Sequence, residues 1–361
     1  MAARLLVATR KGLFVCPPQG DAWSIPRPAF LGEAVSAVLA DPRDGAVYAA
    51  LRHGHFGPKL HRSDDGGESW AEVATPAMPA APADATAKAV DMVWELAAGG
   101  ADQPGVLWAG TLPAALFRSS DRGASWQLVQ ALHDVPERAR WMGGGYDDPG
   151  LHSILVDPRD SQRITVAIST GGVWISPDSG ASWRLAGAGM RNEYMPPGQE
   201  HDPVVQDVHR LAACAAAPDS VWVQHHNGIF RSTDGAESFT EVMAPAPSRF
   251  GFSVAAHPRE KGTAWFAPAV KDECRIPVEG RLVVTRTRDG GRSLEAFGAG
   301  LPGADSYDLI YRHGLAVSSD GARLAMGSTT GNLWVGSDGG EAWRHIAGHL
   351  PPIAAVAFAA G

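Results

Sequence analysis

The chain has 361 residues, a formal net charge of -8 at pH 7 and 45% hydrophobic residues. Its negative charge argues against nucleic acid as a partner, and it holds no apolar run long enough to span a membrane. The N-terminus lacks the apolar core of a secretion signal, and the three cysteines are scattered and odd in number. We therefore expect a soluble, cytoplasmic protein with reduced thiols.

A short segment recurs along the chain, with the template Ser/Thr-x-Asp-x-Gly-x-x-Trp. In chain order its clear copies lie at 63–70, 119–126, 176–183, 232–239, 287–294 and 336–343. The closing residues of these copies, preceded by Trp23 of a decayed copy, stand at 23, 70, 126, 183, 239, 294 and 343, so the steps run from 47 to 57 residues. A regular step of this length indicates an array of one supersecondary unit.

Each copy lies between two short β-rich runs and is expected to form the turn between two strands. Ser and Asp can bond nearby backbone amides, and the closing Trp supplies an apolar surface. We expect four-stranded units over 31–80, 86–130, 150–187, 207–243, 250–298 and 311–349. The first unit, 1–30, supplies strands at 5–9, 12–16 and 23–25, and its inner strand comes from 353–358, within the closing segment 350–361. That pairing would close a ring without exposed sheet edges.

The repeated motif resembles the Asp-box, or BNR repeat, of sialidase-like β-propellers, and the resemblance covers essentially the whole chain. It implies an all-β, seven-bladed β-propeller in a single domain, residues 1–361, with six blades as the alternative. Asp-boxes are structural turns shared by sialidases, other glycosidases, sorting receptors and assembly factors, so they imply a fold and not an activity. Sialidases carry Arg-Ile-Pro ahead of the first box, whereas Arg275-Ile276-Pro277 precedes the fifth clear box here. We therefore do not expect sialic acid cleavage.

Strands of a blade alternate in direction, which places the Asp-box turns on one face and most long loops on the other. Polar connections at 52–58, 131–150, 187–207, 271–277 and 298–311 share this second face. Long loops are usually functional or disordered, and these carry Trp, Tyr, His and paired charges, which is not a disordered composition. We expect the function to lie on the long-loop face.

Histidines are the sharpest candidates on the long-loop face. His152, His209 and His313 each fall where an inner strand begins, and His226 lies beside a tight turn of the same face. Neutral imidazole is a common ligand of transition metals. The pattern predicts one divalent metal (Zn, Mn or Fe) and no organic cofactor. The alternative is that these histidines bond neighbouring loops and buried water.

Acidic, phenolic and basic side chains crowd the same rim. Paired carboxylates, or a Tyr with a Glu, can cleave glycosidic bonds, and arginines can clamp a substrate carboxylate. The candidates for catalysis are Tyr194, Glu200, Asp202, Asp272, Glu273, Arg52 and Arg275, and further arginines that could clamp a substrate are Arg10, Arg191 and Arg312. Taken singly, any of these charges could be solvated or paired with a neighbour.

These observations favour an enzyme that acts on a small polar or carbohydrate-like molecule by hydrolysis or elimination, with metal assistance as an option. The partner expected is a small-molecule substrate, without nucleic acid or membrane, and the oligomeric state stays open. The alternative is a non-catalytic propeller whose rim docks a protein or another ligand. A catalytic pocket predicts inward histidines and carboxylates in a concave site, whereas a docking surface predicts an exposed apolar patch.

Overall fold

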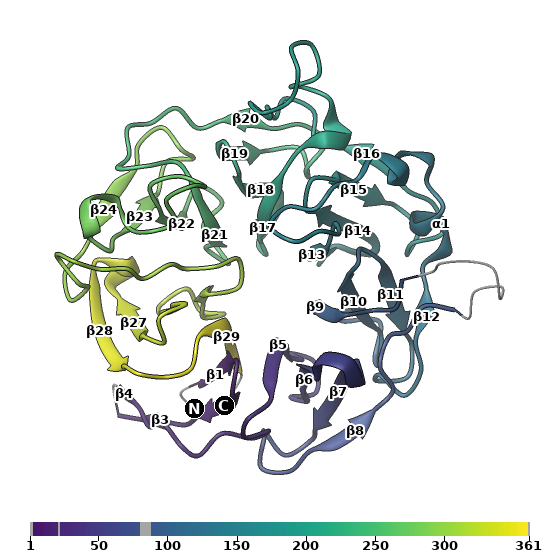
Figure 1. Ribbon diagram of the computed structural model, residues 1–361, viewed down its shortest axis with the longest axis horizontal. Helices are drawn as coiled ribbons and strands as arrows, with labels where there is room; N and C mark the ends of the chain where they lie inside the picture. The colour runs from purple at the N-terminus through teal and green to yellow at the C-terminus, as the bar shows by residue number, and fades with distance from the viewer. Residues whose placement is uncertain (1–2, 21, 80–87, 360–361) are drawn as a thin grey trace.

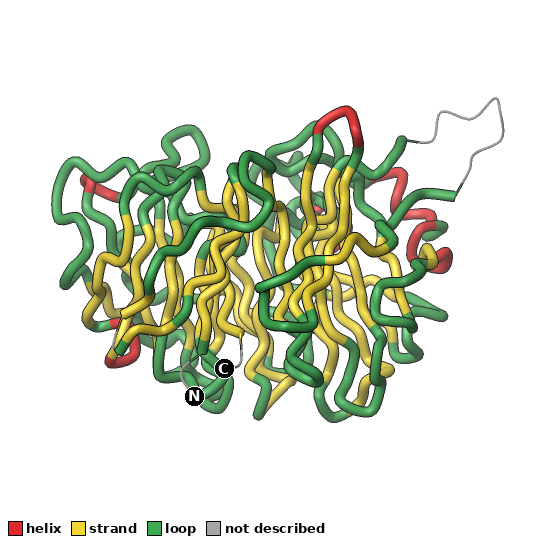
Figure 2. The backbone as a smooth tube through the Cα atoms, turned by 90° about the horizontal axis from the view of Figure 1, so that it is seen from below, coloured by secondary structure: helices red, strands yellow, loops and turns green. Residues whose placement is uncertain are grey.

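The computed structural model describes residues 3–20, 22–79 and 88–359, which form seven sheets in a ring and one small two-stranded ribbon (Figure 1). Inner strands of the blades line a central channel, and the strands run along its axis in side view (Figure 2). The fold is the seven-bladed β-propeller that the repeats predict, and the six-bladed alternative is wrong. No helix in these three ranges is long and apolar enough to cross a membrane.

Six blades are four-stranded antiparallel sheets, ordered along the chain from channel to rim. Their strands are β5 (Ala34–Ala40), β6 (Val47–Arg52), β7 (Pro58–Ser63) and β8 (Ala71–Val73); β9 (Met92–Ala98), β10 (Leu107–Leu112), β11 (Leu116–Ser119) and β12 (Gln127–Leu128); β13 (Leu151–Asp157), β14 (Asp160–Ile168), β15 (Gly172–Ser176) and β16 (Arg184–Ala186); β17 (Val208–Cys214), β18 (Ala217–His225), β19 (Gly228–Ser232) and β20 (Thr240–Glu241); β21 (Gly251–Ala256), β22 (Ala264–Pro268), β23 (Val284–Thr287) and β24 (Glu295–Phe297); β25 (Leu315–Val317), β26 (Leu324–Gly327), β27 (Leu333–Ser337) and β28 (Ala342–Ala347). The short helices α1 (Gln130–His133), η1 (Gly54–Phe56), η2 (Pro136–Arg140), η3 (Pro203–Val205), η4 (Val278–Gly280) and η5 (Asp338–Gly340) lie in connections.

The first blade closes the ring with both ends of the chain. Strand β29 (Ile353–Ala359) pairs antiparallel with β1 (Arg4–Thr9), which pairs with β2 (Gly12–Cys16). The outer strand expected at 23–25 lies instead in a ribbon of β3 (Pro18–Gln19) and β4 (Ala22–Trp23). The following segment bridges β2 only where Ala29 meets Leu13, because Pro26 and Pro28 have no N–H to donate. This blade therefore has a three-stranded sheet.

Five Asp-box turns share one hydrogen-bond pattern. In the box at 176–183, the Ser176 hydroxyl donates to Asp178 and accepts from the Gly180 N–H, while Asp178 accepts from the N–H and hydroxyl of Ser182. The boxes closed by Trp70, Trp126, Phe239 and Leu294 repeat these bonds. In the last box Gly336 and Ala342 lack both hydroxyls, and the turn forms η5. The serine before the closing residue is thus part of the motif.

Replacing Ser176 with alanine is expected to lower the free energy of unfolding by about 1 to 2 kcal/mol, because the buried Gly180 N–H loses its acceptor. Ser337→Ala is the matched control, since the Ser337 hydroxyl only bonds the exposed Asp338, and should change stability by less than about 0.5 kcal/mol. Urea unfolding of both variants measures the difference. Equal losses would show that the Asp-box bonds do not stabilise the blade.

Candidate functional site

Six inner strands carry one extra residue where they reach the long-loop face. The pairing register shifts by one residue at Ser36 of β5, Trp94 of β9, His152 of β13 and His209 of β17, and likewise between Gly251 and Val254 of β21 and between Ile353 and Ala355 of β29. A β-bulge bends a strand and redirects the side chain of the extra residue. The bulges of β5, β9, β13 and β17 place four different side chains around the mouth of the channel.

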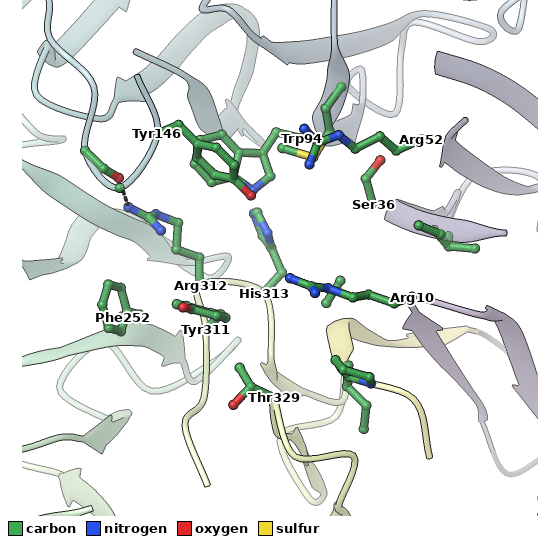
Figure 3. Close-up of a pocket in the computed structure, with 18 of the residues that line it drawn as sticks. Arg10, Ser36, Arg52, Trp94, Tyr146, Phe252, Tyr311, Arg312, His313 and Thr329 are labelled. Atoms are coloured by element: carbon green, nitrogen blue, oxygen red, sulfur yellow. Dashed lines mark hydrogen bonds between the residues drawn. The ribbon is translucent and has the colours of Figure 1, made fainter. Parts of the chain in front are cut away.

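One pocket at this mouth, of about 520 Å³, is rich in arginine and aromatic side chains; we call it the arginine pocket. Its lining includes Arg10, Arg52, Arg275 and Arg312 with Trp94, Tyr146, Phe252, Tyr311 and His313. In Figure 3 Arg10 reaches toward His313 at the centre, and Arg312 lies between Phe252 and Trp94. A pocket of this composition suits an anionic ligand with an apolar body.

Two of these arginines lack a carboxylate partner. Arg52 pairs with Asp91 at 2.6 Å and Arg275 with Asp272, but no carboxylate of the described residues lies within 4.0 Å of Arg10 or Arg312. Arg312 is only 6% exposed, and its guanidinium donates to the Gly144 carbonyl at 3.3 Å. Its Nε is buried without a hydrogen-bond partner. A buried guanidinium without a counter-ion is costly, and its burial lowers its pKa.

The second pocket, of about 660 Å³, adjoins the first and shares Gly144, Gly145, Phe252 and Arg275 with it. We call it the histidine pocket; its other lining residues include Tyr194, Asp207, His209, His226, Asp272 and Glu273. The shared residues place the two pockets side by side at the channel mouth.

Asp207, His209 and His226 bring their ligand atoms within 4.8 Å of one another. The Tyr194 hydroxyl donates to Asp207 Oδ2 at 3.1 Å, and His226 Nδ1 lies 3.3 Å from the same oxygen. Burial lowers the pKa of His209 to about 3 and keeps this imidazole neutral, and burial raises the pKa of Tyr194. Two imidazoles, a carboxylate and a phenol can transfer protons or bind a metal.

A buried polar contact crosses the channel below the arginine pocket. Arg210 of β17 donates to the carboxylate of Glu95 of β9 and to the His152 carbonyl, while His313 Nε2 lies 2.6 Å from Glu95 Oε2. Burial alone would raise the pKa of Glu95, but attraction to Arg210 and His313 outweighs it and the pKa is lowered. Burial lowers the pKa of His313. The contact therefore joins one carboxylate to the guanidinium of Arg210 and the imidazole of His313.

Acidification is expected to destabilise the fold through the buried histidines. Burial lowers the pKa of His152 well below 6.5, with the charges of Arg312 and Arg210 adding to the effect. Below about pH 6.5 His152 therefore binds a proton in the unfolded chain and stays unprotonated in the folded chain. The free energy of unfolding then falls by about 1.4 kcal/mol per pH unit. Urea unfolding at about pH 6.5 and 5.5 should show this loss. In His152→Gln the slope of the free energy of unfolding against pH should correspond to about one bound proton fewer. An unchanged slope in the variant would contradict the assignment.

The other sequence candidates separate into two groups. Tyr194, Asp272, Glu273, Arg275, His209 and His226 line the histidine pocket, and Arg52 and His313 line the arginine pocket. Glu200 and Asp202 lie outside both linings: Glu200 accepts from the Gly198 N–H, and Asp202 caps η3 and pairs with Arg140. His152 is fully buried, with its Nδ1 3.0 Å from the Ser153 hydroxyl. Within the described residues, His152 and His313 do not join the cluster of Asp207, His209 and His226.

Of the three clustered residues Asp207, His209 and His226, Asp207 is the one that the sequence candidates omit. It directly precedes β17, and its carbonyl accepts from the His226 N–H at 3.0 Å. The sequence does contain a signal for Asp207, because it lies two residues before His209 and across from the turn that holds His226. Reading it requires the pairing register of β17 and β18, which aligns Val208 with His225.

No family model matches the chain. A xyloglucanase from Hypocrea jecorina (strain QM6a) is 23% identical over 167 residues, which cover 42% of this chain and 19% of the xyloglucanase. The chain thus spans about a fifth of that relative's length.

Among solved structures, the GH74 xyloglucanase from Xanthomonas campestris aligns with a TM-score of 0.67 at 16% identity, over 95% of this chain and 52% of that chain. YCF48 from Cyanidioschyzon merolae aligns with a TM-score of 0.53 at 13% identity, over 87% and 84% of the two chains. A structure of YCF48 bound to D1 peptide aligns with a TM-score of 0.54 at 14% identity, over 92% and 89%. At these identities the likeness shows the propeller fold alone.

Proposed function

We propose that the chain is a carbohydrate-active enzyme that binds an acidic saccharide across the two pockets and cleaves it by hydrolysis or elimination. The observation that carries this proposal is Arg312, a buried guanidinium in the pocket wall without a carboxylate partner among the described residues. A carboxylate on the ligand would supply the missing partner in a site of low dielectric, where such a pair is strong.

The shape and lining of the pockets support a sugar as the body of this anion. Trp94, Tyr146 and Tyr311 line the arginine pocket and offer apolar ring surface to a pyranose. The second pocket extends the cleft by about 660 Å³, enough for further sugar units. The similarity to xyloglucanases supports a saccharide substrate, since those proteins are named for a polysaccharide, while the acidic group is inferred from Arg312.

The histidine pocket supplies groups for proton transfer beside the anion site. In elimination, a base removes the proton next to the carboxylate, a C–O bond breaks, a C=C bond forms, and an acid protonates the leaving oxygen. Arginine near the carboxylate stabilises the charge that develops there. Tyr194 and His226, which both contact Asp207, are the candidates for acid and base. In hydrolysis the same groups would protonate the leaving oxygen and activate a water.

Cleavage assays on uronate-containing and neutral oligosaccharides test the proposal. New reducing ends with ultraviolet absorption of a conjugated double bond indicate elimination, and new ends without it indicate hydrolysis. Only the acidic series should be cleaved, and Tyr194→Phe should slow cleavage by about 10²–10⁴-fold. Tyr307→Phe is the control, because Tyr307 is 66% exposed and lies outside both linings. Cleavage of neutral substrates alone, or of none, would contradict the proposal.

A second candidate function is the docking of a peptide. The alignment with YCF48 bound to D1 peptide covers 92% of this chain and 89% of that chain, whereas the xyloglucanase is covered over 52%. A peptide C-terminal carboxylate could bind Arg10 and Arg312 as a uronate would. Binding of peptides with free and amidated C-termini, without any cleavage of saccharides, would favour this function.

A further inference from the structure

The residues Asp207, His209 and His226 are brought together by the pairing of β17 with β18. The His226 N–H donates to the Asp207 carbonyl at 3.0 Å, which places the two residues opposite each other at the end of the ladder. His209 is the extra residue of the β17 bulge, which redirects its ring to the same side. Its ring is stacked on Phe252, with centroids 4.5 Å apart, and is thereby fixed in orientation.

Two lone pairs face each other in this cluster. His209 Nδ1 lies 2.6 Å from the Gly251 carbonyl and must donate its proton there, so Nε2 carries the lone pair. That Nε2 lies 3.8 Å from Asp207 Oδ1. Asp207 Oδ1 is buried and has no hydrogen-bond partner, and the residue is only 4% exposed. Two acceptors 3.8 Å apart, one of them buried and unpaired, point to a cation between them.

We propose that Asp207, His209 and His226 bind one divalent transition metal at the wall of the histidine pocket. Ligands at about 2.1 Å from a common ion lie up to about 4.2 Å apart, so the 3.8 Å between His209 Nε2 and Asp207 Oδ1 suits a shared ion. The ligand atoms of all three residues lie within 4.8 Å of one another, so a shift of a few tenths of an ångström would bring His226 to the same ion. Two imidazoles and one carboxylate select Zn²⁺, Fe²⁺ or Mn²⁺ over Mg²⁺ and Ca²⁺.

The surroundings of the cluster match those of metal ligands. Ligand histidines usually donate their second N–H to a carbonyl or carboxylate, as His209 does to Gly251. The Tyr194 hydroxyl holds Asp207 Oδ2 and leaves Oδ1 toward the site. With three protein ligands and an open pocket on the other side, the site keeps positions free, as catalytic metal sites do.

This inference adds a cofactor to the proposed function and rests on it only for the role of the ion. A bound ion would take up the lone pair of His226, so a water bound to the ion, whose pKa the ion lowers, would replace His226 as the partner of Tyr194 in proton transfer. Metal binding itself is measured without saccharide, so the two ideas can fail separately.

The test is equilibrium dialysis of the full chain against Zn²⁺, followed by elemental mass spectrometry, with visible spectroscopy of the Co²⁺-loaded chain as a second readout. We expect one metal ion per chain, and absorption bands of Co²⁺ with nitrogen ligands. Asp207→Asn and His226→Ala should each weaken Zn²⁺ binding by at least about 100-fold. His345→Ala is the control, because its ring is exposed, bonds Asn332 and lies outside the pocket. Circular dichroism of the variants checks that they fold.

The outcomes separate clearly. Wild-type chain without stoichiometric Zn²⁺, or folded Asp207→Asn and His226→Ala variants that retain it, would overturn the metal site. Cleavage of acidic saccharides that is unaffected by a chelator would also overturn its role in the reaction while leaving the proposed function intact. Stoichiometric Zn²⁺ that depends on Asp207 and His226, without cleavage of any saccharide, would confirm the metal site and contradict the proposed function.

Discussion

Replacing Arg312 with methionine is expected to weaken binding of an acidic saccharide by about 100-fold or more. Arg312 is buried between Trp94 and Phe252, with its guanidinium 5.0 and 5.5 Å from the two ring centroids. Loss of one partner of a desolvated charge pair costs about 3 kcal/mol, which is about 100-fold in affinity. Isothermal titration calorimetry with a uronate oligosaccharide measures the change.

The same variant should be at least as stable as the wild-type chain without ligand. Methionine fills a similar volume and removes a buried charge that has no carboxylate partner among the described residues. Arg281→Met is the matched control, because Arg281 is exposed on the same face and lies outside both pockets. A large loss of stability with unchanged affinity would make Arg312 a structural residue and remove the main support for the anion site.

Replacing Glu95 with glutamine is expected to lower the free energy of unfolding by about 3 to 5 kcal/mol. The substitution leaves Arg210 charged and largely buried beside a neutral amide, and it replaces one accepting carboxylate oxygen with an NH₂ group that can only donate. Urea unfolding measures the loss. Glu33→Gln is the control, since Glu33 is 46% exposed and pairs only with His53, and it should change stability by less than about 0.5 kcal/mol.

A double variant separates charge from packing in the channel. Glu95→Gln with Arg210→Met removes both charges, and it should recover part of the stability lost in Glu95→Gln alone. A loss below about 1 kcal/mol in the single variant would show that the contact across the channel does not hold the blades together.

The fold was predictable because each blade repeats one turn with its own chemistry. Ser, Asp and Gly at fixed spacing make the same bonds in five boxes, and the step between boxes sets the blade length. The outer strand of the first blade was not predicted correctly, because Pro26 and Pro28 interrupt the hydrogen-bond ladder there. Its decayed box includes Asp21, which lies outside the described residues.

The sequence predicts which face of the propeller carries the site, but it does not predict which side chains of that face come together in each pocket. Alternating strand directions bring Tyr194, His226 and Asp272 to one face, which the order of the strands predicts. The bulges that turn Trp94 and His209 toward the channel mouth depend on cross-strand register, which the residue pattern does not reveal. Equally, the pairing of His313 with Glu95 depends on side chains from blades that are far apart in the sequence.

The cleft is expected to recognise the acidic group of a saccharide, and one pair of titrations measures this recognition. Calorimetry would compare a uronate oligosaccharide with the same oligosaccharide after its carboxyl groups are reduced to alcohols. We expect the acidic form to bind at least about 100-fold more tightly, with an advantage that shrinks as salt rises. Equal affinity for the two forms, or binding of neither, would contradict recognition of the acidic group.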